Sequence, residues 1–328
     1  MKQFYLFFPL CFLILSCSVA SFEKENSRNT EGFTLATWNV QTFFDSEFEG
    51  TEYSDFQNLS KWSKDKYMSR LSRLCEVMSS INADVFVLEE IENVAVVQDI
   101  ANQMTDGAWS KENGWSYACF SKISGSAIGC AVFSRLELKD MKIHTTDIQV
   151  QNQRQPSARP LIQVTLSLDG KDLELFVNHW KSKSGGEVKT EIWRDWQEMV
   201  LANRLKEMLA GKSDASYVLC GDFNRDIKDF VKDGNKVLLR GSNSIVHVIS
   251  PWLNSSGNSA FDTGSYYYDG AWEKIDHIFS AGRITVSAFR PRTDGVWCSA
   301  GGVPNAYKLY SGEGYSDHLP LMCVISFE

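Results

Sequence analysis

The feature of this sequence that most constrains its fold is a set of short apolar segments, most of which lead into polar side chains. The segments are rich in β-branched and aromatic residues, which favour strands. They cover Thr34–Val40, Asp84–Leu88, Leu173–Val177, Tyr217–Cys220, Ile275–Phe279 and Leu319–Ile325, and the polar groups at their ends include Asn39, Glu89, Glu90, His179, Asp222 and Asn224. Because a strand end fixes a side chain better than a free loop does, we expect these groups to meet at one edge of a sheet.

Two longer segments carry the apolar period of a helix. The first follows a predicted cap at Ser63 and places Tyr67, Leu71, Leu74, Cys75, Met78 and Ile81 on one face. The second follows Thr190, runs to Gly211 and carries Trp193, Trp196, Val200 and Met208. Strands and helices alternate along the chain, so the sequence predicts an α/β or α+β fold in which helices cover the sheets.

The composition is that of a packed globular protein. The chain has 328 residues, of which 43% are hydrophobic and 23% charged, and this excludes disordered, collagen-like and multi-span membrane proteins. No repeat or Pro/Gly linker interrupts residues 33–328, where we predict one domain. Lys plus Arg number 33 against 41 Asp plus Glu, giving a net charge of −8. Any phosphate substrate must therefore be held by local cations or by a metal ion.

Residues 1–17 are predicted to be an export signal. The apolar run from Phe4 to Leu15 is shorter than the roughly 20 residues of a spanning helix. It leads into Cys17 through a pattern similar to the cleavage box of bacterial lipoproteins, so Cys17 is the predicted lipidation site and residues 18–32 are a polar tether. The protein would then be an exported lipoprotein of the cell envelope, with its lipid anchor as the sole membrane contact. Cleavage after Ala20, which would give a secreted protein, stays open as the alternative.

Six of the eight cysteines lie beyond the export signal, and none belongs to a CxxC pair. This argues against a metal cluster and against thioredoxin chemistry. A turn centred on Ser124-Gly125 would place Cys119 opposite Cys130, which makes them the first disulfide pair to test in an exported chain. The alternative is that the thiols pack as small buried side chains.

Six short motifs in chain order resemble those of a known family. They are Trp38-Asn39-Val40, Leu88-Glu89-Glu90, Asn178-His179, Gly221-Asp222-Phe223-Asn224, Ile275-Asp276-His277 and Ser316-Asp317-His318. Each motif is weak alone, but together they resemble the endonuclease/exonuclease/phosphatase family, with its DNase I-like fold. Ala158-Arg159-Pro160 and the segment 178–186 are similar to exported bacterial nuclease-like members. The resemblance covers residues 33–328 and implies a four-layer α/β sandwich, in which two packed mixed β-sheets flanked by helices share a rim that holds the site.

The resemblance also implies a metal site. Oxygen-rich ligands without thiolates select a hard ion such as Mg²⁺, with Mn²⁺ or Ca²⁺ as alternatives. Glu90 is the principal implied ligand, Asn39 lies next to it, and Asp317 is a third or second-site ligand. Glu89 stands where the family usually has Gln, which leaves open which of the two carboxylates binds the metal.

The remaining roles follow from what phosphodiester cleavage requires, namely an aligned water, charge neutralisation and help for the leaving group. The resemblance implies that Asp222 orients or deprotonates the water and that Asn224 holds the water or a phosphoryl oxygen. Asp276 would hold His318 and favour its charged form. Arg159 and His179 would contact the scissile phosphate, and His179 could also protonate the leaving group.

Several residues lie outside this set. The other histidines are His144 and His247, which have no motif context, and His277, which strand alternation points away from Asp276. Lys181 and Lys183 either grip phosphate or belong to a solvated loop. The aromatic segment Gly264–Trp272 either stacks on bases or sugars or packs beneath a loop.

The function expected first is that of an exported, Mg²⁺-dependent phosphodiester hydrolase, a nuclease that cuts DNA or RNA. We expect it to act as an endonuclease and as a monomer. A sphingomyelinase or inositol-phosphate phosphatase of the same fold is the second hypothesis, because fold does not choose substrate. A surface lipoprotein that only binds a partner is the third. No expected site residue is missing from the chain, which favours an enzyme over this third possibility.

Overall fold

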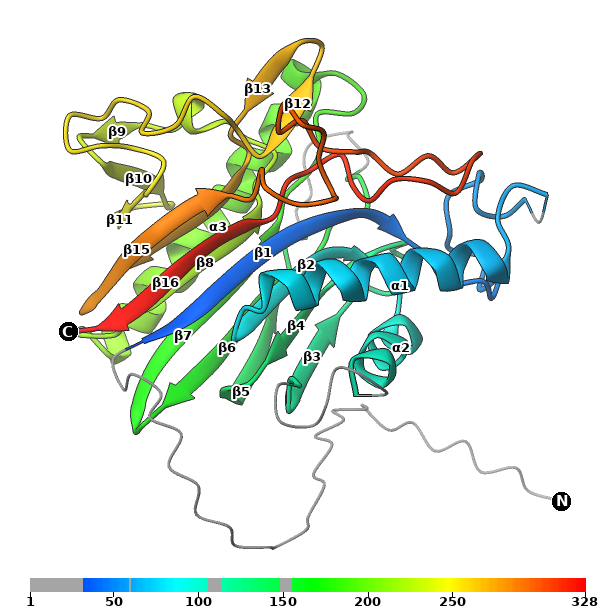
Figure 1. Cartoon of the computed structure of the whole chain (residues 1–328). Helices are drawn as coiled ribbons and strands as arrows, with labels where there is room; N and C mark the ends of the chain where they lie inside the picture. Colours follow the sequence, from blue (N-terminus) through cyan, green and yellow to red (C-terminus); the bar gives the residue numbers. More distant parts are fainter. Residues whose placement is uncertain (1–31, 59, 106–113, 148–154) are drawn as a thin grey trace, which may run out of the picture.

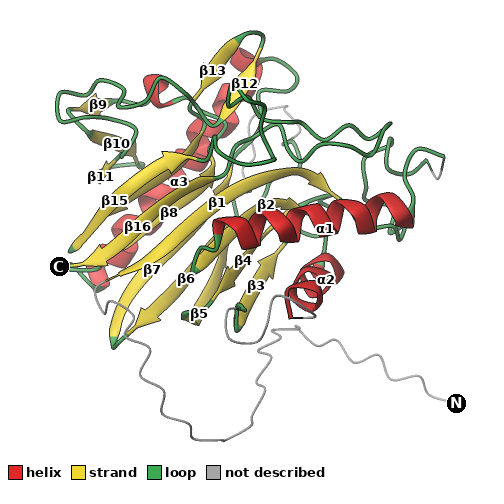
Figure 2. Ribbon diagram, in the orientation of Figure 1, coloured by secondary structure: helices red, strands yellow, loops and turns green. Residues whose placement is uncertain are grey.

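The computed structural model describes residues 32–58, 60–105, 114–147 and 155–328, so the predicted export signal, Cys17 and nearly all of the tether lie outside the described residues. Two large sheets pack against each other, with helices on both outer sides (Figure 1 and Figure 2). Within the described ranges, no helix is long and apolar enough to cross a membrane.

The first sheet has six strands in the order β15-β16-β1-β2-β4-β3. They are β1 (Gly32–Phe43), β2 (Val85–Ile91), β3 (Tyr117–Ser121), β4 (Gly129–Ser134), β15 (Ile284–Pro291) and β16 (Leu321–Phe327). Strand β1 is parallel to β2 and antiparallel to β16, so the sheet is mixed. This pairing brings the last strand of the chain beside the first.

The second sheet has eight strands in the order β5-β6-β7-β8-β14-β11-β10-β9. They are β5 (Glu137–His144), β6 (Leu161–Leu168), β7 (Lys171–His179), β8 (Tyr217–Asp222), β9 (Lys232–Asp233), β10 (Lys236–Arg240), β11 (Ile245–Ile249) and β14 (Asp276–Ala281). Strands β7 and β8 are parallel, whereas β14 is antiparallel to β8. A small separate hairpin is formed by β12 (Tyr266–Tyr268) and β13 (Ala271–Glu273).

Three α-helices in the described ranges complete the four layers, and a short 3₁₀ turn, η1 (Ile227–Asp229), follows β8. Helices α1 (Lys64–Ile81) and α2 (Val94–Thr105) share one apolar core with the six-stranded sheet. Helix α3 (Glu187–Gly211) packs against the eight-stranded sheet. The predicted sandwich of two mixed sheets flanked by helices is therefore confirmed.

The two helices expected from sequence are present. Ser63 caps α1 by accepting a hydrogen bond from the Lys66 N–H, and all six predicted apolar positions of this helix are buried. Helix α2 was not expected, because its valines favour a strand by intrinsic preference. Asn93 is a local signal for the start of this helix, because its side-chain oxygen accepts a hydrogen bond from the Val96 N–H, as the side chain of an N-cap residue does.

Side-chain alternation in β2 explains how one strand serves two layers. Val85 and Val87 belong to the core that lies between the sheets, whereas Phe86 and Leu88 belong to the core beneath α1 and α2. Burial on both faces produces an unbroken apolar run, as the sequence shows. Val85 and Val87 face the second sheet, and alternate residues of a strand face the same way. Glu89, two positions after Val87, therefore also faces the second sheet.

The predicted hairpin around residues 119–130 exists, but the predicted disulfide is wrong. Strands β3 and β4 pair Cys119 with Val132 and Ser121 with Cys130. The turn lies one position later than Ser124-Gly125, and this shift moves each cysteine opposite another residue. Cys130 is fully buried and unbridged, consistent with the alternative of a thiol that packs as a small apolar side chain.

Candidate active site

One row of the eight-stranded sheet carries three of the predicted site residues. The strand register pairs His179 of β7 with Asp222 of β8, and Asp222 with Asp276 of β14. Residues paired across neighbouring strands project to the same side of a sheet, so these three side chains stand next to one another at its end. Each is no more than 2% exposed.

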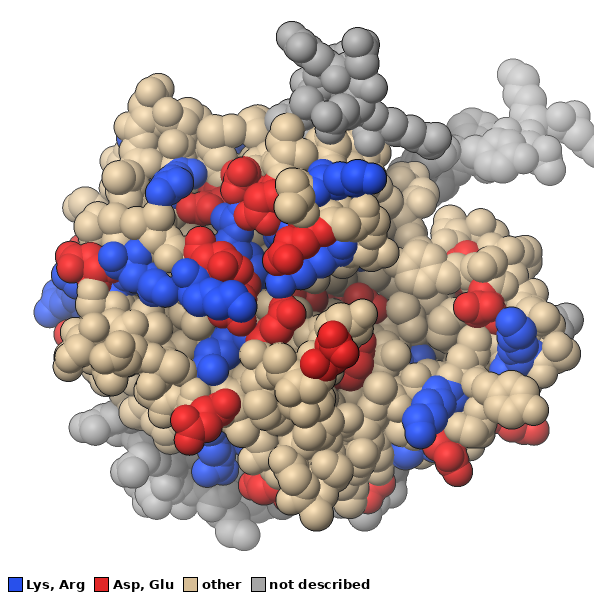
Figure 3. Space-filling view, turned by 90° about the horizontal axis from the view of Figure 1, so that it is seen from above, with Lys and Arg blue, Asp and Glu red and all other residues tan. Residues whose placement is uncertain are grey.

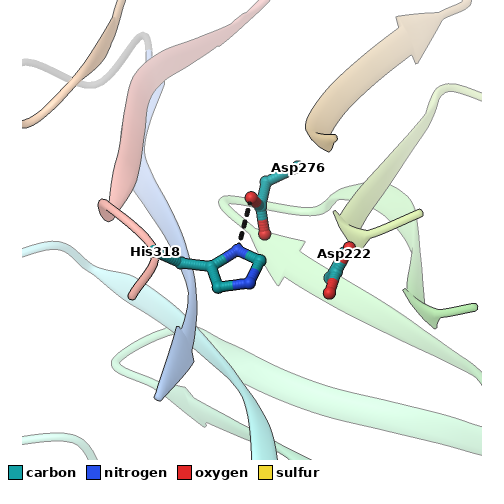
Figure 4. A group of neighbouring side chains, drawn as sticks. All are labelled: Asp222, Asp276 and His318. Carbon is teal, nitrogen blue, oxygen red and sulfur yellow. Dashed lines mark hydrogen bonds and ion pairs between the residues drawn. The ribbon is translucent and has the colours of Figure 1, made fainter. Parts of the chain in front are cut away.

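His318 reaches this row from the other sheet, where it lies just before β16. Its Nδ1 lies 2.8 Å from Asp276 Oδ2, and Figure 4 shows the pair beside Asp222. The Trp38 indole donates to the His318 carbonyl at 2.9 Å, which fixes the backbone. Burial opposes protonation of His318, but the charge and hydrogen bond of Asp276 outweigh it and raise the pKa of His318 well above its usual value. This shift favours the charged form of the imidazole at neutral pH.

Glu90 faces the same rim because the backbone departs from strand geometry at this residue. Its φ of 68° is left-handed, and the register between β2 and β4 shifts between Glu89 and Ile91. A bulge of this kind re-aims a side chain. Glu90 Oε1 lies 3.3 Å from Asn39 Nδ2 and 3.6 Å from His179 Nε2. Glu90 and Asn39 thus face into the site together.

Glu89, in contrast, is sealed beneath the rim. It is fully buried, its Oε1 accepts the Thr37 hydroxyl at 2.7 Å, and its Oε2 has no hydrogen-bond partner among the described residues. Burial raises the pKa of Glu89 well above its usual value, and the Thr37 hydrogen bond only partly opposes this shift. A neutral carboxylic acid resembles the glutamine expected here, so Glu90 is the carboxylate placed for a cation.

Asp222 is held by two asparagines. The Asn224 N–H donates to its Oδ1 at 2.7 Å, and its Oδ2 accepts from Asn224 Nδ2 at 2.9 Å and from Asn39 Nδ2 at 3.1 Å. Burial, reinforced by the charge of Asp276, raises the pKa of Asp222 to about 7. A carboxyl group with such a pKa can exchange a proton with water near neutral pH.

His179 lies between the two carboxylates without a close hydrogen bond to either. Its Nε2 is 3.6 Å from Glu90 Oε1 and 3.8 Å from Asp222 Oδ2. Burial, together with the charge of Arg159, lowers the pKa of His179 well below its usual value. A neutral ring can donate one hydrogen bond, which suits a phosphoryl oxygen better than delivery of a proton to a leaving group.

Arg159 and Asp317 complete the predicted set at its edges. The Arg159 charge acts on His179 and on the hydroxyl of Tyr53, with which Arg159 shares a hydrogen bond. Asp317 is half-buried, and its N–H donates to Gln41 Oε1 at 3.1 Å. Its charge helps to raise the pKa of His318, after the larger effect of Asp276.

Arg70 of α1 supports the site and was missed by sequence reasoning. Its guanidinium donates to the carbonyls of Val40, Gln41 and Thr42 and lies 3.7 Å from the centre of the Tyr307 ring. Gln41 and Thr42 are left-handed, and the Thr42 N–H donates to Glu90 Oε2. The available signal was an arginine on the apolar face of a helix, where a charge needs buried partners.

The three histidines outside the predicted set have structural or surface positions, whereas the aromatic hairpin lies beside the site. His277 points away from the site, stacks on Phe279 and bonds the Arg225 carbonyl, while His144 bonds Gln163 and His247 is exposed. In the aromatic hairpin, Tyr266 lies 4.8 Å from His318 between ring centres. Tyr268 stacks parallel to Tyr266 and is 64% exposed, so this part of the hairpin is a surface beside the site.

The donor set fits a hard divalent cation. In the described part of the chain, the carboxylates and imidazoles whose ligand atoms all lie within 4.8 Å of one another are Asp222, Asp276 and His318. A charged His318 disfavours a cation on that side. Glu90 and Asp222 both contact Asn39, and among the described residues no Lys or Arg forms an ion pair with either carboxylate. Oxygen donors of this kind suit Mg²⁺ and related ions.

Two packed sheets that bring paired acids, amides and imidazoles to one rim define the class of DNase I-like hydrolases. A model of the Endonuclease/Exonuclease/phosphatase family matches residues 34–292, which is most of the chain. The protein belongs to this family. No curated protein matches the chain by sequence.

Solved structures share the fold at low identity. Truncated TDP2 of Caenorhabditis elegans has a TM-score of 0.57 and 15% identity, covering 90% of this chain and 98% of its own. The catalytic domain of human Nocturnin with bound sulfate has a TM-score of 0.54 and 17% identity, covering 90% and 95%. TDP2 of D. rerio with a single-strand DNA product has a TM-score of 0.52 and 17% identity, covering 90% and 99%.

Proposed function

We propose that this protein is an exported, divalent-metal-dependent phosphodiesterase that cleaves nucleic acid, with Mg²⁺ as its ion and endonucleolytic action as a monomer. The observation that carries the proposal is the row of His179, Asp222 and Asp276, which meets His318 and Glu90 from the facing sheet. This row supplies an acid that exchanges protons, a charged imidazole and an oxygen-rich cation site. Each of these groups can assist phosphodiester hydrolysis by activating water or by neutralising charge on the phosphoryl oxygens.

Each residue has a proposed role. Glu90 would hold the cation through its carboxylate and Asn39 through its amide oxygen, which here accepts the Gln41 N–H, with Asp317 contributing at the edge. The bound ion would neutralise charge on the phosphoryl oxygens. Asp222 would orient the attacking water and take its proton, while Asn224 keeps the carboxylate in place. His318, charged by its contact with Asp276, and neutral His179 would both contact phosphoryl oxygens. Arg159 would add positive charge at the far side of His179.

Two observations support nucleic acid as the substrate. The fold is shared with the TDP2 structure that holds a single-strand DNA product. The Tyr266 and Tyr268 rings lie beside His318, where a base or sugar next to the cleaved phosphate can stack. A sphingomyelinase would instead need an aliphatic surface for docking on lipid.

The test is a panel of plasmid DNA, single-stranded DNA, RNA, sphingomyelin and inositol phosphates, each with Mg²⁺, Mn²⁺, Ca²⁺ or EDTA. We expect plasmid nicking with Mg²⁺, none in EDTA, and a loss of about 10²- to 10⁴-fold in His179→Ala. His247→Ala, which changes an exposed histidine of β11, is the matched control. Undiminished cutting by His179→Ala would refute the site, and turnover of sphingomyelin alone would refute the substrate.

We also propose that Cys17 carries a lipid that anchors the protein to the cell envelope. The pattern before Cys17 and the short apolar run support this location. Labelling of cells with a fatty-acid analogue should tag the wild-type protein and not Cys17→Ser. Release of an untagged wild-type protein into the medium would instead indicate ordinary secretion.

A further inference from the structure

A hollow lies between the segment 155–159 that leads into β6 and the part of α3 that carries Trp193, Trp196 and Gln197. Its wall includes Arg159, Lys181, Trp193 and Trp196. The residues that line the hollow do not include the row of acids, and the charges of Arg159 and Lys181 both act on His179.

Two basic side chains line the hollow, and the described residues place no carboxylate in an ion pair with either of them. In the described ranges, neither Arg159 nor Lys181 has a carboxylate oxygen within 4.0 Å. Basic and acidic side chains do lie side by side elsewhere, as Figure 3 shows for part of one face of the molecule. Burial and the charges of Arg159 and Arg194 lower the pKa of Lys181, which places this lysine in positive surroundings. In a protein of net charge −8, such a pair is poised for an anion.

The backbone of Lys181 is held rigidly by α3. Its N–H donates to Gln197 Oε1 at 2.7 Å, and its carbonyl accepts from Arg194 at 3.1 Å. Its Nζ donates to oxygens of Ser182 and Ser184 at 3.0 to 3.3 Å, all of them neutral. A phosphate oxygen could replace these neutral acceptors with a charged one, which makes a stronger hydrogen bond.

Lys183, two residues further on, shows the contrasting arrangement. Its Nζ lies 2.9 Å from Glu187 and 2.8 Å from Glu273, so its charge is already paired. It ties the start of α3 to the aromatic hairpin. The two lysines therefore lie in the same loop and are both cationic. Lys183 is paired with carboxylates, whereas Lys181 has no carboxylate within 4.0 Å in the described ranges, and this difference makes Lys183 the matched control.

We propose that the hollow lined by Arg159 and Lys181 binds a second phosphate of the substrate, one nucleotide away from the phosphate that is cleaved. The inference rests on the proposed function, because it takes His179 to mark the cleaved phosphate. Arg159, whose charge acts on both His179 and Lys181, would contact both phosphate groups. A substrate recognised in this way is a nucleotide chain with consecutive phosphates, and a compound with one isolated phosphate fills only half of the site.

The test is calorimetric titration of the purified protein in EDTA with the dinucleotide dTpdT and with the same dinucleotide carrying an added 5′ or 3′ terminal phosphate. We expect one of the phosphorylated forms to bind about 10-fold more tightly than dTpdT. Lys181→Gln should abolish this gain and leave dTpdT binding unchanged, whereas Lys183→Gln should keep the gain. Equal affinity for all three dinucleotides, or an intact gain in Lys181→Gln, would overturn the inference.

Cleavage of dTpdT with Mg²⁺, measured in the same preparations, separates this inference from the proposed function. Cleavage without an affinity gain means that the second-phosphate site alone is wrong. An affinity gain without cleavage of any nucleic acid means that the proposed function alone is wrong and the anion site remains. Inositol 1,4-bisphosphate serves as a further ligand, and tighter binding of it than of either phosphorylated dinucleotide would overturn the assignment to a nucleotide chain.

Discussion

Asp276 Oδ2 lies 2.8 Å from His318 Nδ1, and this contact joins the two sheets at the rim of the sandwich. Asp276 begins β14 of one sheet, whereas His318 precedes β16 of the other. The pair therefore does two things at once. It fixes the orientation of the imidazole, and it keeps the ring charged in a buried place where a neutral ring would otherwise be favoured.

Asp276→Asn should lower activity strongly with little change of shape. Asparagine keeps the size of the side chain but removes the negative charge, so the pKa of His318 should fall. We expect kcat/KM to drop by about 10²- to 10⁴-fold, a range found for positioned acid–base groups. NMR titration of His318 checks the cause, since an unchanged pKa in the variant would show that Asp276 does not set the charge of the ring.

Glu89→Gln and Glu90→Gln should behave oppositely, although the residues are adjacent. Glu90 faces Asn39 and His179, so Glu90→Gln should abolish activity and weaken Mg²⁺ binding. Glu89 is fully buried and stays neutral, so Glu89→Gln should retain most activity. Activity assays and calorimetric Mg²⁺ titration of both variants make the comparison. A greater loss in Glu89→Gln would mean that the inner carboxylate is the ligand.

The metal-free protein should become less stable as pH rises from about 4 to about 7. Asp222 has its pKa raised to about 7 in the folded state, against roughly 4 in the unfolded chain. The folded state therefore binds a proton in this window that the unfolded state has lost, so the free energy of unfolding falls with rising pH. Asp222→Asn should flatten this slope in urea denaturation with EDTA. Parallel slopes in wild type and variant would contradict the assignment.

Arg70→Met should destabilise the protein by about 3 kcal/mol, because it leaves buried carbonyls without donors. It should also raise the Mg²⁺ concentration needed for half-maximal activity, since the left-handed turn that presents Thr42 to Glu90 loses its support. Arg70→Lys should restore part of both losses. Arg204→Met, on an exposed part of α3, is the control and should change neither. A normal metal requirement in a destabilised Arg70→Met would limit Arg70 to a purely structural role.

The strands and the motif order could be predicted from the sequence, and the structure places those residues at one rim. Strands β2 and β8 are buried on both faces, so each appears in the sequence as a continuous apolar run that local patterns reveal. The helices at 64–81 and 187–211 were equally visible, because their apolar periods are long. Helix α2 escaped detection, since valine-rich segments of that length fit a strand as well as a helix.

The different roles of Glu89 and Glu90 could not be predicted from local sequence patterns. Both are carboxylates at the end of one strand, and the sequence alone left their roles open. Their difference arises from a left-handed φ at Glu90 and from the Thr37 hydroxyl on a neighbouring strand. The Cys119–Cys130 pairing failed for a related reason, because a shift of one position in the turn changes every partner across the hairpin.

The amino-acid sequence determined the class of fold, the chemical types available at the rim and the strands that deliver them, because side-chain period and strand preference are local properties. Only the tertiary structure decided which carboxylate faces a cation, which histidine carries charge and which lysine of the 181–183 loop lacks an acidic partner. Those outcomes depend on register, on burial and on groups that lie 42 to 90 residues away in the chain, and short-range patterns carry no information about such contacts.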